Sequence, residues 1–151
     1  MNDKWQIYFM DIAKRTSEMS KDPITKVGAV FAKDKHILSI GFNGAPSAFP
    51  DELVPSDEGE AILDKKNTYM CHAELNAVLN YNGHLKDLND STLYVTVCPC
   101  TKCSLILSQL KIKNVIYLKD YRRKEENDAA KYIMDKCGIN YKKYSEDENE
   151  N

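Results

Sequence analysis

The sequence predicts an α/β fold, a three-layer α/β/α sandwich with a central five-stranded mixed sheet. Two observations predict it: a helix and a strand hairpin come first, and helices and strands then alternate along the rest of the chain. A hairpin pairs antiparallel strands, whereas crossover helices join parallel ones, so the sheet should be mixed. The 151 residues suit one domain, which we expect at residues 1–144, followed by an acidic, disordered tail at residues 145–151.

The first third of the chain supplies the helix and the hairpin. Apolar residues recur at helical spacing between residues 3 and 18, and Pro23 lies just beyond this helix, where it prevents continuation. Residues 27–32 and 36–42 are short apolar runs on either side of a polar turn, which predicts two antiparallel strands. Residues 47–67 are acidic and lack a period, so we expect a long loop of the kind that is usually functional or disordered.

The rest of the chain alternates between the two kinds of element. The expected elements are a helix from His72 that stops at Gly83, a strand at 92–97, a helix at 103–110, a strand at 114–118, a helix at 125–137 and a strand at 139–144. The strand at 92–97 is the clearest, because β-branched and aromatic residues dominate it. With the hairpin, these segments complete five strands.

Bulk composition excludes several classes of function. The formal net charge is −2, so no global basic field exists to hold a nucleic acid polymer. No apolar run approaches the length of a transmembrane helix, and we expect no membrane partner. The first residues lack the basic-then-apolar pattern of an export signal, which predicts a cytoplasmic protein.

A small group of residues carries metal chemistry. Three of the five cysteines lie between residues 98 and 103, and in a reducing compartment such a cluster indicates metal binding rather than disulfides. Cys100 and Cys103 lie three apart at a helix start, and His72 lies at the start of the preceding helix. Three protein ligands leave a fourth tetrahedral position open, as in catalytic zinc sites. We therefore expect one catalytic Zn²⁺ per chain.

Glu74 completes a known signature. The pattern His-x-Glu followed by Pro-Cys-x-x-Cys is that of zinc nucleobase deaminases, in which the glutamate is the general acid and base. Zinc-bound hydroxide would attack C4 of cytosine while Glu74 moves the protons. Ala73, Cys98 and Pro99 should border the base, the last two through backbone carbonyls that accept from its amino group. Singly, the Cys pair could be a redox dithiol, the histidine a core residue and the glutamate a helix-dipole partner; together they favour a deaminase.

Several segments resemble the deoxycytidylate (dCMP) deaminase family of the cytidine deaminase superfamily over nearly the whole chain. They are 20–30, 41–44, 71–77, 93–96 and 99–103. The resemblance implies zinc-dependent conversion of dCMP to dUMP for thymidylate synthesis, in a homo-oligomer, with a hexamer favoured. It also implies dCTP and dTTP effectors, with Mg²⁺ accompanying such a nucleotide. Some family members hold a second zinc in the loop before the histidine, but no Cys or His lies between Gly44 and Met70 here, so one zinc per chain is expected.

The resemblance also assigns substrate and effector residues. Asn43, Lys21 and Tyr121 would contact the nucleotide substrate, and Gly41, Asn43 and Gly44 would border the effector site. Each has a plain structural alternative: Asn43 a turn at a strand end, Lys21 a solvated lysine and Tyr121 a core aromatic. The basic cluster at residues 121–124 could bind phosphate, contact another subunit or be a solvated helix start.

Other functions stay open at this point. A dCTP deaminase or a dual dCMP/dCTP deaminase would share the zinc chemistry. A tRNA adenosine deaminase would need a basic surface for its substrate, which the acidic loop disfavours. Free cytidine deaminases usually carry a third cysteine at the position of His72, and a non-catalytic zinc module would not need Glu74.

Overall fold

A five-stranded mixed sheet forms the centre of the molecule. The structure is a computed structural model that describes residues 2–149. The strands are β1 (Gly28–Lys33), β2 (His36–Phe42), β3 (Thr92–Val97), β4 (Asn114–Lys119) and β5 (Asn140–Lys143), in the spatial order β2-β1-β3-β4-β5. β1 pairs antiparallel with β2 and β3, whereas β3–β4 and β4–β5 are parallel. The predicted mixed five-stranded sheet is therefore confirmed.

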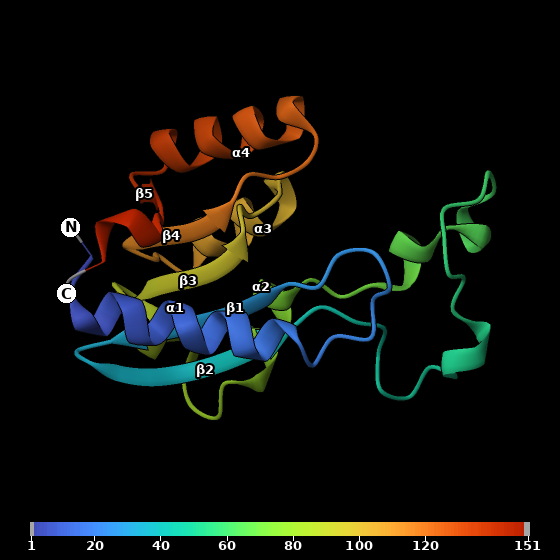
Figure 1. The fold of residues 1–151 in the computed structure, drawn as a ribbon, viewed down its shortest axis with the longest axis horizontal. Helices are drawn as coiled ribbons and strands as arrows, with labels where there is room; N and C mark the ends of the chain where they lie inside the picture. The colour runs from blue at the N-terminus through green and yellow to red at the C-terminus, as the bar shows by residue number, and fades with distance from the viewer. Residues whose placement is uncertain (1, 150–151) are drawn as a thin grey trace.

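Helices cover both faces of this sheet (Figure 1). They are α1 (Lys4–Ser17), α2 (Ala73–Asn80), α3 (Thr101–Gln109) and α4 (Lys124–Lys136). Alternate strand residues point to opposite faces, so Val30 and Tyr94 pack with α1 residues such as Met10. Phe31 and Leu93 join the core on the other face, which includes residues of α2, α3 and α4. This arrangement is the three-layer sandwich that the sequence predicts.

Local hydrogen bonds explain where the helices begin and end. Asp3 caps α1 in a capping box with Gln6, which starts the helix at the expected place. α3 begins two residues earlier than expected because Cys100 is its N-cap, its sulfur accepting from the backbone N–H of Cys103. α2 ends at Asn80, before the glycine that was expected to stop it. Gly138 adopts φ 78°, a conformation that favours glycine, just after α4.

The tail expected at residues 145–151 contacts the N-terminal part of the chain over its described residues. Residues 146–148 form a 3-10 helix, and the Asn2 side chain donates to the carbonyl of Ser145 at 2.7 Å. Glu146 forms an ion pair with Lys14 of α1. These contacts join residues 145–149 to the N-terminal part of the chain, and the disorder expected for the tail stays a prediction. The last two residues of the predicted tail lie outside the described residues.

The long segment between β2 and α2 extends away from the sheet, on the side opposite the chain termini (Figure 1). It was expected as a loop and contains three short 3-10 helices, Asp51–Leu53, Ile62–Asp64 and Lys66–Tyr69. At its base, Gly44 and Cys71 form an isolated antiparallel bridge. We refer to residues 45–70 as the protruding segment. None of the helices within residues 2–149 has the length and apolar character needed to span a bilayer.

Candidate active site

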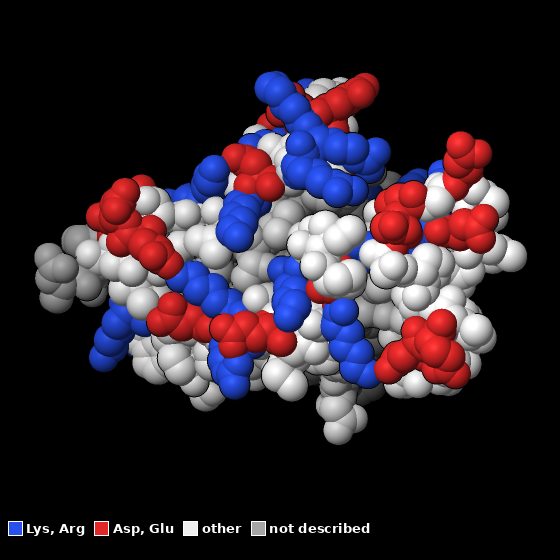
Figure 2. Space-filling view, turned by 45° about the vertical axis from the view of Figure 1, so that its right-hand side comes forward, with Lys and Arg blue, Asp and Glu red and all other residues white. Residues whose placement is uncertain are grey.

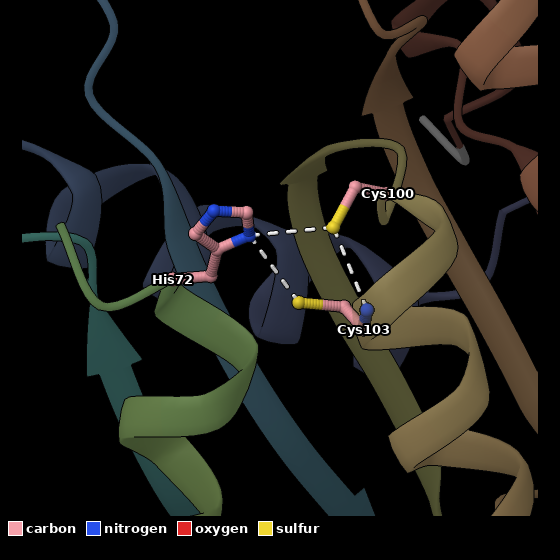
Figure 3. A group of neighbouring side chains, drawn as sticks. All are labelled: His72, Cys100 and Cys103. Atoms are coloured by element: carbon pink, nitrogen blue, oxygen red, sulfur yellow. Dashed lines mark hydrogen bonds between the residues drawn. The ribbon is translucent and has the colours of Figure 1, made fainter. Parts of the chain in front are cut away.

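Three potential metal ligands meet where two helices begin (Figure 3). His72 is the N-cap of α2, Cys100 is the N-cap of α3, and Cys103 lies in the first turn of α3. Their ligand atoms all lie within 4.8 Å of one another, and this is the one such group found among residues 2–149. Both sulfur atoms are 3.4 Å from Nδ1 of His72.

These distances fit a tetrahedral zinc. Zn–S bonds of about 2.3 Å and Zn–N bonds of about 2.0 Å at tetrahedral angles separate a sulfur from a nitrogen by about 3.5 Å. The observed separations of 3.4 Å match this value on both edges. Two thiol sulfurs and one imidazole nitrogen are also ligands that zinc prefers. His72 is exposed whereas Cys100 and Cys103 are buried, so the group opens to solvent on the histidine side.

The surroundings favour negative charge on sulfur. The pKa of Cys100 is lowered, first by its hydrogen bond with the Cys103 thiol and then by His72. The same hydrogen bond raises the pKa of the Cys103 thiol, and burial adds to this shift. Both cysteines lie at the N-terminus of α3, whose dipole stabilises an anion. The site can therefore provide the thiolate character that zinc binding requires.

Glu74 lies beside this group without belonging to it. It is the second residue of α2 and only 5% exposed. Burial raises the pKa of its carboxyl to about 7, while neighbouring His72 opposes the shift. A carboxyl with a pKa near neutrality can both accept and release a proton at physiological pH. A divalent cation at the adjacent ligands would favour the carboxylate and lower this pKa.

A cavity of about 440 Å³ joins the metal group to other predicted residues. We call it the active cavity. Among the residues proposed for substrate, it is lined by Asn43, Ala73, Cys98 and Tyr121. Burial raises the pKa of the Cys98 thiol to about 12, so this cysteine is neutral. Pro99 is fully buried and is not among the lining residues.

The remaining predicted residues lie elsewhere. A second cavity, of about 1050 Å³, is lined by Lys21 and Gly44, and Asn43 borders both cavities. Lys21 does not line the active cavity, where a substrate phosphate contact was expected; its ammonium pairs with Asp51 at 2.8 Å. Gly41 lines neither cavity, because it packs against the backbone of α2.

The structure adds residues that the sequence analysis did not place in the site. Besides Lys66, four basic residues line the active cavity: Lys102, Lys119, Arg122 and Arg123. Figure 2 shows Lys and Arg side chains gathered in the upper centre of one face, whereas Asp and Glu side chains gather on the right, where the protruding segment lies. Residues 121–124 were recognised as basic, but their contact with the cavity depends on β4 lying beside β3. Glu126 of α4 accepts from both the backbone and the hydroxyl of Thr101, at 2.9 and 2.8 Å, and so caps α3 beside the metal group.

The sequence analysis also did not predict a buried ion pair in the wall of the active cavity. Asp22 and Lys66 both line the active cavity and pair at 2.8 Å. Asp22 lies in a segment that carried the family resemblance, but Lys66 comes from the protruding segment, which has no periodic pattern. No sequence signal would have distinguished this lysine from its exposed neighbour Lys65.

Comparison with known proteins agrees with the geometry of the site. Residues 3–119 match the family model described as the cytidine and deoxycytidylate deaminase zinc-binding region. Mouse deoxycytidylate deaminase is 37% identical over 94% of this chain and 80% of its own length, and the human protein is 36% identical over 93% and 80%. The dCMP deaminase of cyanophage S-TIM5, solved with dCMP and dUMP, aligns with a TM-score of 0.74 and 27% identity over 95% of this chain and 99% of its own. The chain belongs to the cytidine and deoxycytidylate deaminase family.

Proposed function

We propose that the protein catalyses the hydrolytic deamination of dCMP to dUMP and ammonia, which supplies dUMP for thymidylate synthesis. One observation carries the proposal: the buried carboxyl of Glu74 and the group His72–Cys100–Cys103 line or border one cavity of about 440 Å³. Zinc held by these three residues supplies a Lewis acid that brings the pKa of a bound water to about 7.

Glu74 moves the protons in this proposal. Its carboxylate accepts a proton as water adds to C4 of the cytosine ring, and delivers that proton to N3. A second transfer through the same carboxyl protonates the departing amine, so ammonia leaves and the uracil carbonyl forms. Because Glu74 is almost fully buried, bulk water does not compete for these protons.

Basic residues at the cavity support a nucleotide rather than a nucleoside. Lys102, Lys119, Arg122 and Arg123 give this part of the wall four positive charges against the two carboxylates of Asp120 and Glu126, and the N-terminus of α3 adds a partial positive charge. A 5′-phosphate is the anion that such a wall would bind. The acidic protruding segment and the net charge of −2 disfavour a tRNA substrate.

The test compares substrates on one zinc-loaded preparation. Loss of the cytosine absorbance band is followed with dCMP, dCTP, deoxycytidine and cytidine. We expect turnover of dCMP and far slower turnover of the two nucleosides. Equal turnover of dCTP would move the assignment to a dual deaminase. No turnover of any of them would refute the proposal.

A matched pair of variants tests the role of Glu74. Glu74→Gln removes the proton acceptor and keeps the side-chain shape, so kcat should fall by at least about 10²- to 10⁴-fold while zinc stays bound. Glu125→Gln makes the same change at an exposed residue in the first turn of α4 and should leave kcat unchanged. Zinc content is measured for both proteins. An undiminished kcat in Glu74→Gln would eliminate the proposed proton transfer.

The proposal extends to regulation and assembly. The second cavity, which Asn43 and Gly44 line, is large enough for a nucleotide effector such as dCTP or dTTP with Mg²⁺. Exposed apolar side chains on β2 and α2, such as Ile40, Phe42 and Leu79, support a homo-oligomer, and the proposal includes a cytoplasmic location for it. Kinetics with added dCTP or dTTP, together with light scattering, test these two points.

A further inference from the structure

A buried ion pair lies in the wall of the active cavity. The ammonium of Lys66 is 2.8 Å from Oδ1 of Asp22, and the two side chains are only 5% and 3% exposed. Lys66 belongs to the protruding segment, whereas Asp22 belongs to the turn before β1. Burying two charges is costly unless they pair closely, so this contact ties the two segments at one defined point.

Asp22 connects the ion pair to Asn43, which lines the active cavity. Its Oδ1 also accepts from the backbone N–H groups of Ile24 and Thr25, at 2.8 and 3.1 Å, and its Oδ2 lies 3.4 Å from Nδ2 of Asn43. Burial alone would raise the pKa of Asp22, but the hydrogen bonds from Lys66 and the two backbone groups outweigh it and lower that pKa. Asp22 is therefore a carboxylate that these donors hold in place.

Asn43 is fixed by the same network. Its side-chain oxygen accepts from the N–H of Val27 at 2.9 Å, and its Nδ2 donates to the carbonyl of Thr25 at 2.9 Å. Asn43, Thr25 and Val27 all line the active cavity. The position of Lys66 therefore affects three residues that line the active cavity and lie far from Lys66 in sequence.

We propose that Lys66 is a positioning residue, which anchors the protruding segment to the cavity wall and, through Asp22, holds Asn43 in place for substrate. Asn67 and Met70 of the same segment also line the active cavity, so anchoring Lys66 places them as well. The inference rests on the proposed function for its effect on substrate, whereas the anchoring itself is independent of that function.

A second ion pair between the same stretches of chain shows why burial matters. Lys21 and Asp51 also pair at 2.8 Å, but their side chains are 81% and 70% exposed. Solvent screens such a pair and both side chains stay free to move, so it adds little. The anchor is therefore the Lys66 pair, and removing Lys66 alone leaves a buried carboxylate without its cation.

The experiment compares Lys66→Met with Lys65→Met, the same substitution at the exposed preceding residue. Glutamyl endopeptidase cleaves after glutamate, and the protruding segment exposes Glu52, Glu58 and Glu60, which neither substitution changes. Without substrate, we expect Lys66→Met to be cleaved in this segment at least about tenfold faster than the unaltered protein. With dCMP, its KM should rise by about tenfold with a smaller change in kcat and unchanged zinc content. Lys65→Met should match the unaltered protein in every measurement.

A further variant separates anchoring from general loss of folding. Lys66→Met with Asp22→Asn removes the orphaned charge, so this double variant should fold better than Lys66→Met yet keep the raised KM. Wild-type cleavage and KM in Lys66→Met would overturn the inference, as would a KM restored by Asp22→Asn. If the unaltered protein does not turn over dCMP, the proposed function fails, whereas the cleavage comparison still decides whether Lys66 anchors the segment.

Discussion

Gly41 sets how closely β2 approaches α2, the helix that begins at the metal group. A Cβ at this position would lie 2.3 Å from the backbone nitrogen of Ala77 and 2.6 Å from the carbonyl oxygen of Ala73. Ordinary contacts begin near 3.4 Å, and both obstacles are backbone atoms that cannot rotate away. Gly41→Ala must therefore push α2 roughly 1 Å from β2.

The expected cost follows from the bonds across this contact. Ser39, Asn76 and Asn80 make side-chain hydrogen bonds between β2 and α2, to the carbonyls of Ala77, Phe42 and Ile40 respectively. Overpacking costs about 1–3 kcal/mol and each weakened hydrogen bond adds up to about 1 kcal/mol. We expect a loss of about 3 kcal/mol, which lowers Tm by roughly 6–12 °C in a protein of this size.

Thermal unfolding and zinc content measure the effect. Because α2 carries His72 and α3 carries both cysteines, moving α2 should also weaken zinc binding. Gly44→Ala is the control, since an added Cβ there meets no atom within 4 Å. Its Tm should change by no more than about 2 °C. A Tm in Gly41→Ala equal to that of Gly44→Ala would refute the packing argument. If Gly41→Ala changed the response to dCTP or dTTP but not Tm, this result would instead favour the effector role expected for Gly41.

Two other substitutions test buried and paired groups. The pKa of Asp120 is lowered to about 2 by hydrogen bonds from Lys143, Lys131 and Asn127. These bonds stabilise the fold at pH values above the ordinary carboxyl pKa, and this stabilisation is lost as pH falls from about 4 to 2. Because Asp120 is 44% exposed, Asp120→Asn should lower the free energy of unfolding in urea by at most about 1 kcal/mol at neutral pH. A difference in unfolding free energy between variant and unaltered protein that persists near pH 2 would contradict this explanation. Ser104 is fully buried and its hydroxyl has no hydrogen-bond partner. Ser104→Ala should therefore gain about 1 kcal/mol, and a lowered Tm would argue against it.

Sequence alone predicted the order of elements because each has a local cause. The apolar period of residues 3–18 and the β-branched run at 92–97 depend on neighbours within a few positions. The boundaries of the elements were predicted less accurately. α3 begins where the sulfur of Cys100 accepts from the backbone N–H of Cys103, and the spacing of apolar residues does not reveal such a bond. The contacts of residues 145–149 with Asn2 and Lys14 were not predicted, because these partners are distant in sequence.

The metal group and Glu74 were predicted from spacing, because ligand chemistry restricts which residues can stand together. His72, Cys100 and Cys103 need only two helix starts side by side, which the order of strands and helices implies. The other residues that line the active cavity could not be predicted in this way. Lys66 reaches Asp22 across 44 residues, and the basic residues after β4 meet the cavity only because β4 lies beside β3. Sequence therefore determined the chemistry of the centre, whereas tertiary packing decided which distant side chains enclose it, because those contacts have no repeating local pattern.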